Sequence, residues 1–237
     1  MVKHNGPLIS PGQSEDALPW AIRDYPDWRG LELDSFAGVE AQIAALADDI
    51  AYNNHDIDDG LRAGLLHLDA LAELPLVGDV LRDCRRRFPQ ASERLVILEA
   101  VRDLIGLMVD DVLTETRSRL DAAQPDSAEA VRKADREMVA FSPSMLDALA
   151  GLRRHLFANM YRHYKVNRAM AQAERVVHEL FSLFLEDPGL LPTHYRQQAG
   201  EAGSKQQARL VSDYIAGMTD RYAVEEHKRL FTVQGYF

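Results

Sequence analysis

Residues 46–60, LADDIAYNNHDIDDG, form the stretch that decides the fold class. They continue an apolar pattern at 3.6-residue spacing, which is typical of a helix with one buried face. The apolar positions of this pattern are Phe36, Val39, Ile43, Leu46 and Ile50. A helix over about 35–54 is therefore predicted, with an apolar stripe along one side.

The rest of the chain shows helical patterns separated by short turns that contain proline or glycine, and no alternating strand pattern. Ser142 and Pro143 predict a helix start, because serine caps a helix and proline suits its first turn. Within 91–122 the apolar positions Leu95, Leu98, Val101 and Leu104 recur every three residues. Further helices are expected over 56–72, 76–87, 91–122, 126–138, 142–164, 166–186 and 205–231.

These patterns predict an all-α fold, a multi-helix bundle with an irregular lead-in over 1–34. No clean domain boundary is visible, so a single helical domain over 1–237 is expected. The chain has no apolar run of about 18 residues and no apolar core of signal-peptide length near Met1, so we expect no membrane span and a cytoplasmic protein. The net charge of -10 argues against a large nucleic-acid footprint. The single cysteine, Cys84, excludes an internal disulfide and a cysteine-cluster metal site.

Polar side chains follow one line along the first long helix. Asp48, Tyr52 and Asp56 are four residues apart, and each step turns the helix by about 40°, so all three can share a face. The neighbours on that face are small residues, Ala41, Ala44, Ala45 and Ala51. Small residues let another helix or a ligand approach closely. The alternative is that these acids are ordinary surface residues, because acidic runs are usually solvated.

Residues 46–60 also resemble a segment of the HD-superfamily deoxynucleoside triphosphate triphosphohydrolases, the dGTPase-like proteins, whose pattern is close to ADDIAYxxHDxxDA. Residues 153–165, RRHLFANMYRHYK, resemble a family helix that carries an arginine and, eight residues later, a tyrosine. Residues 211–222, VSDYIAGMTDRY, resemble the family's C-terminal fingerprint, and the opening VKHNGPL resembles a segment that is normally internal. The matched segments run through nearly the whole chain, and the resemblance implies an HD-domain-like bundle.

The resemblance implies a role for each matched residue. Asp48 matches the last aspartate of the family's H…HD…D metal set. Tyr52 and Asp56 match positions that contact the sugar and phosphates, Arg153 matches an arginine on the phosphates, and Tyr161 matches an aromatic residue on the sugar and base side. Asp49 stands where some relatives place a lysine on the phosphates, which an aspartate cannot replace.

One part of the family pattern is absent from this sequence. The first histidine and the HD pair of the family lie upstream of the VKHNGPL segment. The visible His55–Asp56 pair follows the final aspartate and is not that motif. We therefore expect this chain to be the C-terminal part of a longer protein, truncated before the H…HD ligands, with Asp48 as its only metal ligand and no complete catalytic site.

The resemblance implies hydrolysis of a deoxynucleoside triphosphate, with dGTP as the preferred guess, to deoxynucleoside and triphosphate. It also implies a divalent metal, Mg²⁺, Mn²⁺ or another transition metal, and a homo-oligomer. As a truncated chain the protein is expected to be inactive. The alternatives are a non-catalytic helical fragment that binds nucleotides or oligomerises, and a plain helical protein–protein module.

Overall fold

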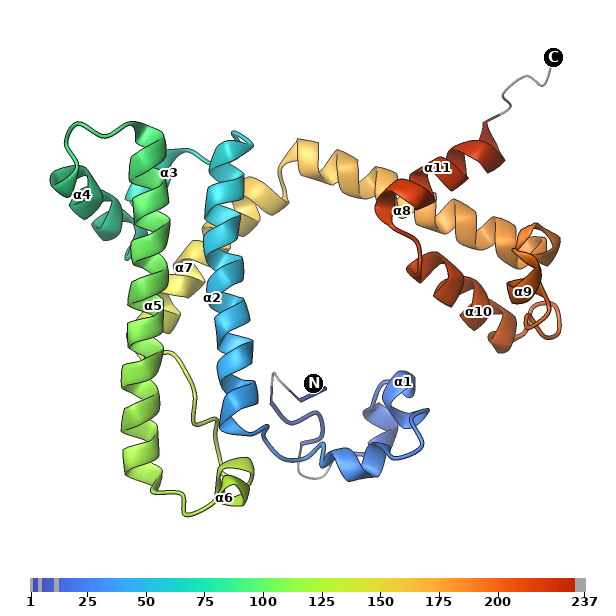
Figure 1. Cartoon of the computed structure of the whole chain (residues 1–237), viewed down its shortest axis with the longest axis horizontal. Coiled ribbons are helices and arrows are strands. Elements are labelled where there is room, and N and C mark those ends of the chain that lie inside the picture. The colour runs from blue at the N-terminus through green and yellow to red at the C-terminus, as the bar shows by residue number, and fades with distance from the viewer. Residues whose placement is uncertain (1, 4–5, 11–12, 233–237) are drawn as a thin grey trace. The chain divides into compact units, whose positions relative to one another are not determined.

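A computed structural model of the chain describes residues 2–3, 6–10 and 13–232, and every regular element within these ranges is a helix (Figure 1). The all-α prediction is therefore confirmed. The chain forms two compact units, Met1–Tyr161 and Arg162–Phe237. The single-domain prediction over 1–237 stays a prediction. No helix in the described part of the chain is both long and apolar enough to cross a bilayer.

The first unit is built on two long helices. Helix α2 (Val39–Arg62) and helix α5 (Glu93–Ala123) lie side by side and run in opposite directions (Figure 1). Helix α4 (Val77–Arg87) packs on α5, and helix α7 (Pro143–Leu156) packs on α2. Short helices complete the unit: α1 (Trp20–Arg23), α3 (Leu68–Ala72) and α6 (Ala128–Arg132). The predicted helix over 126–138 is thus limited to its first part.

Helix α2 is longer than the sequence pattern predicts. It continues through Asn53 and Asn54 to Arg62, so the expected break near residue 55 is wrong. Both asparagines are buried, and each donates its side-chain amide to the carbonyl four residues earlier, at 2.6 Å for Asn53 and 2.8 Å for Asn54. Because these amides bond within the helix, they do not end it.

The buried face of α2 also differs from the predicted stripe. Ile43 is 48% exposed, whereas its neighbour Gln42 is buried. The Gln42 amide donates to the carbonyl of Ala37 at 2.8 Å, and its oxygen accepts from the backbone N–H groups of Met138 and Val139 at 2.9 and 3.0 Å. A buried polar residue is favourable here because it pairs with three backbone groups that would otherwise be unsatisfied.

Helix α5 matches its predicted range, and Ser92 caps it by accepting from the N–H of Leu95 at 3.4 Å. Its buried positions recur every four residues: Val96, Ala100, Leu104, Met108 and Val112. Of the apolar residues spaced by threes, only Leu104 is buried. The helices that pack on α5 therefore contact a different face from the one marked by the apolar residues spaced by threes.

The second unit has its own core under helix α8 (Tyr164–Glu186). Helices α10 (Lys205–Ala216) and α11 (Asp220–Phe231) pack on α8, and α9 (Thr193–Arg196) is a single turn. The prediction of one helix over 205–231 is wrong. The chain breaks after α10 because Thr219 starts a new helix, accepting from the N–H of Tyr222 at 3.3 Å.

Candidate functional site

The site elements are α2 and the end of α7. Helix α7 begins as predicted: Ser142 accepts from the N–H of Met145 at 3.2 Å, and Pro143 occupies the first turn. After Leu156 the chain passes into a π turn over Phe157–Tyr161. In a regular α-helix, eight residues would leave Arg153 and Tyr161 about 80° apart around the axis. A π turn takes up an additional residue, so both side chains face α2.

Arg153 makes the first of two contacts with α2. Its Nη2 atom lies 3.3 Å from Oδ2 of Asp49, and its Nε donates to Oδ1 of Asn53 at 3.3 Å. The side chains of Arg153 and Asp49 are about half exposed. The sequence predicted Arg153 as a site residue but missed both partners. The four-residue spacing of Asp49 and Asn53 places them on one helix face, and nothing local links them to a residue about a hundred positions away.

Tyr161 makes the second contact. Its hydroxyl donates a hydrogen bond to Oδ2 of Asp56. Burial raises the pKa of Tyr161, and hydrogen bonding with Asp56 and Tyr52 raises that pKa further. Three of the five predicted site residues, Tyr52, Asp56 and Tyr161, therefore lie together, and the tyrosine is held as a neutral donor. Tyr52 is 60% exposed, so a ligand can reach its side chain.

Asp48 lies apart from these contacts. It is exposed on α2 and lines a hollow of about 510 Å³ with the small side chains of Ala41, Ala44 and Ala45. Lys3 lines the same hollow, and its Nζ donates to the carbonyl of Glu32 at 2.8 Å and to the Ser35 hydroxyl at 2.9 Å. The alanine face predicted from the sequence therefore surrounds Asp48 rather than Tyr52 and Asp56.

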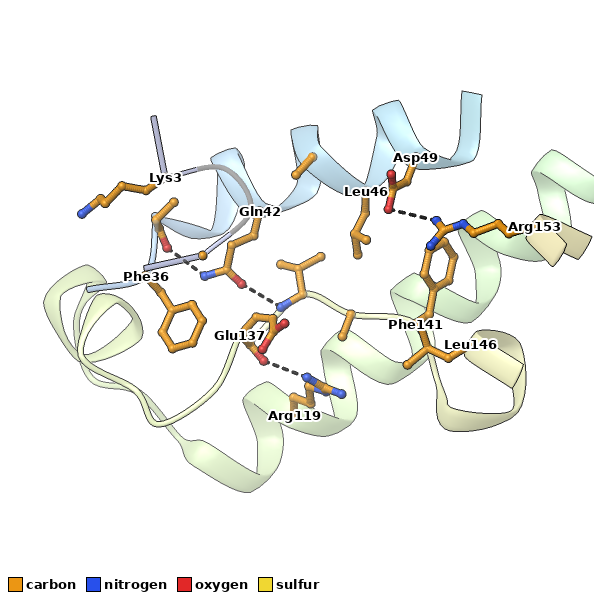
Figure 2. A pocket seen from close by; sticks show the side chains of 15 residues that line it. Lys3, Phe36, Gln42, Leu46, Asp49, Arg119, Glu137, Phe141, Leu146 and Arg153 are labelled. Carbon is orange, nitrogen blue, oxygen red and sulfur yellow. Dashed lines mark hydrogen bonds and ion pairs between the residues drawn. The ribbon is translucent and has the colours of Figure 1, made fainter. Parts of the chain in front are cut away.

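A cavity of about 330 Å³ adjoins Arg153 between α2 and the segment before α7 (Figure 2). Figure 2 shows Asp49 and Arg153 facing each other at one end of the cavity and Phe36 at the other. Its wall includes Arg119, whose Nε lies 2.8 Å from Oε1 of Glu115. Of the five predicted site residues only Arg153 lines this cavity, so the set is not gathered in one closed pocket.

The donor set of the described residues does not fit a complete metal centre. Divalent metals in proteins need several ligands from histidine, carboxylate or thiolate groups. Across the described ranges, no group of three such side chains lies together in a way that could hold an ion. Asp48 can supply one carboxylate, and one carboxylate is not a site.

The chain is similar in sequence to known proteins. Residues 139–229 match the family model of the phosphohydrolase-associated domain. This range contains Arg153 and Tyr161. Proteins named deoxyguanosinetriphosphate triphosphohydrolase-like align with nearly the whole chain. The relative from Parvibaculum lavamentivorans is 53% identical over 231 residues, and the relative from Caulobacter sp. (strain K31) is 49% identical over 232 residues. The relative from Mesorhizobium japonicum is 46% identical over 233 residues.

The matched domain is one that belongs to the HD phosphohydrolases. More narrowly, the chain is similar to the C-terminal part of the proteins named deoxyguanosinetriphosphate triphosphohydrolase-like. In each of the three alignments the matched region is 98% of this chain and 58% of the relative.

Proposed function

We propose that this chain supplies the sugar- and phosphate-binding part of a deoxynucleoside triphosphate triphosphohydrolase, which converts dNTP and water to deoxynucleoside and triphosphate. The names of the relatives support this reaction class and suggest dGTP as substrate. The observation that carries the proposal is the pair of contacts between α2 and α7, Arg153 with Asp49 and Tyr161 with Asp56. They present a guanidinium cation and an oriented carboxylate along one surface, which suits a triphosphate joined to a sugar.

Arg153 is the residue for the triphosphate. A guanidinium binds two phosphate oxygens at once through its planar fork, and it neutralises charge that develops as the bond to the phosphate breaks. Its present partner, Asp49, is half exposed, and exposed ion pairs contribute only roughly 0.2–1 kcal/mol. Arg153 can therefore leave Asp49 for a phosphate at small cost. Asp49 thus holds Arg153 in the unliganded protein instead of binding phosphate as a lysine would.

Tyr52, Asp56 and Tyr161 are the residues for the sugar and the adjoining phosphate. Tyr161 donates to Asp56, which orients the carboxylate and leaves its other oxygen to accept from a sugar hydroxyl. The exposed Tyr52 ring offers an apolar surface for a deoxyribose. A ribose would bring an additional hydroxyl against that ring, so the contact favours the deoxy sugar.

Asp48 would supply one ligand of a divalent metal, whose chemistry is to polarise a phosphate oxygen and acidify a water. The remaining ligands must come from residues other than those described, since no complete donor set lies among them. We therefore propose that residues 1–237 bind nucleotide but do not hydrolyse it by themselves. The second candidate is a protein that binds nucleotides and has no catalytic role at all. The incomplete donor set among the described residues favours this candidate.

Equilibrium binding of dGTP to residues 1–237 tests these assignments. The wild-type chain should bind dGTP, and Arg153→Ala should weaken binding by about tenfold, the effect of losing one charged contact. Arg154→Ala is the matched control, since Arg154 is the adjacent exposed arginine and has no place in the site. Equal losses in both variants, or no loss in Arg153→Ala, would remove Arg153 from the site.

A further inference from the structure

Asn53 is a buried amide in contact with the exposed guanidinium of Arg153. Asn53 is 3% exposed, whereas the side chain of Arg153 is 50% exposed. The Asn53 Oδ1 atom accepts a hydrogen bond from Nε of Arg153 at 3.3 Å. Burial of a polar side chain is costly unless the side chain is hydrogen-bonded. The bond to Arg153 is thus one of the contacts that make an asparagine acceptable at this buried position.

Two hydrogen bonds fix the orientation of the Asn53 side chain. Its Nδ2 donates to the carbonyl of Asp49, four residues earlier in α2, at 2.6 Å. The oxygen and the nitrogen of an amide lie on opposite sides of its plane, so tying the nitrogen to the helix backbone directs the oxygen elsewhere. That oxygen contacts Arg153. Because the side chain is buried and bonded at both ends, Asn53 presents a fixed acceptor to the guanidinium.

Asp49 is a different kind of partner for the same arginine. Its Oδ2 lies 3.3 Å from Nη2 of Arg153, and its side chain is 52% exposed. An exposed carboxylate can turn to water at small cost, and the negative charge of a triphosphate repels it. When a triphosphate binds Arg153, Asp49 should therefore leave the guanidinium while Asn53 stays in contact.

The planar guanidinium keeps one edge for the phosphate. It has five N–H donors in one plane, one on Nε and two on each Nη nitrogen. Asn53 and Asp49 bond to Nε and Nη2, so neither of these bonds uses Nη1. With Nε held by Asn53, the plane keeps its orientation, and Nη1 and Nη2 can together bind two phosphate oxygens. A side chain that is ordered before binding loses less conformational entropy when the ligand arrives.

The absence of charge on Asn53 matters as much as its position. A carboxylate at residue 53 would pair with Arg153 and cancel its charge, whereas an amide oxygen accepts the Nε–H and leaves that charge intact. We propose that Asn53 is the positioning residue of this site, a fixed and neutral acceptor that orients Arg153 for the triphosphate. This role of Asn53 rests on the proposed binding of the triphosphate by Arg153.

Titrations of residues 1–237 with dGTP and with deoxyguanosine, followed by the NMR signals of the ligand, test this role. Asn53→Ala and Asn53→Asp should each weaken dGTP binding by about tenfold, the first through lost orientation and the second through cancelled charge. Both variants should keep the affinity for deoxyguanosine, because Arg153 acts on the phosphates alone. A purely structural residue would lower both affinities together.

Asn54→Ala is the matched control for loss of a buried amide. Asn54 is also buried and donates to the carbonyl four residues earlier, at 2.8 Å, but its amide contacts Met108 instead of Arg153. The ratio of the dGTP and deoxyguanosine affinities should therefore stay unchanged in this variant. A ratio that falls as far as in Asn53→Ala would overturn the positioning role.

Double variants distinguish this role from the proposed function of Arg153. Because Asn53 acts through Arg153, Asn53→Ala should cause no further loss of dGTP affinity when it is added to Arg153→Ala. Asp49→Asn should tighten dGTP binding by about threefold, since it removes the competing partner. If Arg153→Ala weakens dGTP binding but Asn53→Ala or Asn53→Asp binds as tightly as the wild type, the role of Asn53 is overturned and that of Arg153 stands. Wild-type affinity in Arg153→Ala would overturn both.

Discussion

Gln42 connects α2 to the segment before α7 through three hydrogen bonds to backbone groups. Gln42→Leu would leave two N–H groups and one carbonyl without a partner in a buried position. We expect the free energy of unfolding to fall by about 3 kcal/mol, the cost of unsatisfied buried groups. Chemical denaturation measures this. Ile43→Ala, at the adjacent exposed position, should cost less than about 1 kcal/mol. A larger loss of unfolding free energy in Ile43→Ala than in Gln42→Leu would mean that the apolar stripe predicted from the sequence is the buried face.

Ionisation of Tyr161 makes the free energy of unfolding depend on pH in the alkaline range. Folding raises its pKa above the ordinary value near 10, so the folded chain holds the phenol proton more tightly than the unfolded chain. This stability is fully present below about pH 10 and is lost as pH rises through the raised pKa. Tyr161→Phe should therefore flatten the fall in unfolding free energy above about pH 10. Tyr25→Phe, at an exposed position, provides the reference slope. A Tyr161→Phe slope equal to that of the wild type would show that Tyr161 is not buried as described.

At the scale of the elements, the π turn at Phe157–Tyr161 sets the register between Arg153 and Tyr161. Inserting one alanine after Ala158 adds a residue that the π turn does not take up, so Tyr161 should turn by about 100° away from Asp56. A phenol freed from burial should ionise near pH 10, so absorbance titration should show one more tyrosine titrating there. Ala158→Gly keeps the residue count and is the control. An unchanged titration after the insertion would mean that the π turn does not set the register between Arg153 and Tyr161.

Local patterns predicted most of the helices but not how they face one another. Ser142 with Pro143 gave a helix start because capping depends on adjacent residues. The break before Thr219 was missed, although its capping residue is visible in the sequence, because helical patterning continues on both sides. The buried side of α2 could not be predicted, since the backbone groups that favour Gln42 over Ile43 belong to residues almost a hundred positions away.

The candidate site was predictable in part for the same reason. The shared face of Tyr52 and Asp56 follows from helical spacing. The approach of Tyr161 to that face depends on tertiary packing and on a π turn that the sequence pattern does not reveal. The roles of Asp48, Arg153 and Tyr161 in catalysis or binding came from the family resemblance and stay predictions.

At the scale of the whole molecule, each of the two compact units has a main hydrophobic core of its own. The second unit packs around Phe184 and Leu180, which are fully buried, and Phe184→Ala should destabilise this unit by about 3–5 kcal/mol. Hydrogen exchange followed by mass spectrometry should then quicken in α8, α10 and α11 and stay unchanged in α5. Leu104→Ala, in the first core, is the converse control. Equal quickening in both units would support the single domain predicted over 1–237.

The most direct test of the central claim is release of triphosphate from dGTP in the presence of Mn²⁺. Two proteins are compared: residues 1–237 alone, and a fusion in which the unmatched N-terminal part of the Parvibaculum lavamentivorans relative precedes this chain. We predict turnover by the fusion, loss of at least about a thousandfold in its Asp48→Ala variant, near-normal turnover in its Asp59→Ala variant, and none by residues 1–237. Turnover by residues 1–237 alone, or near-normal turnover by the Asp48→Ala fusion, would contradict the proposed division of the site.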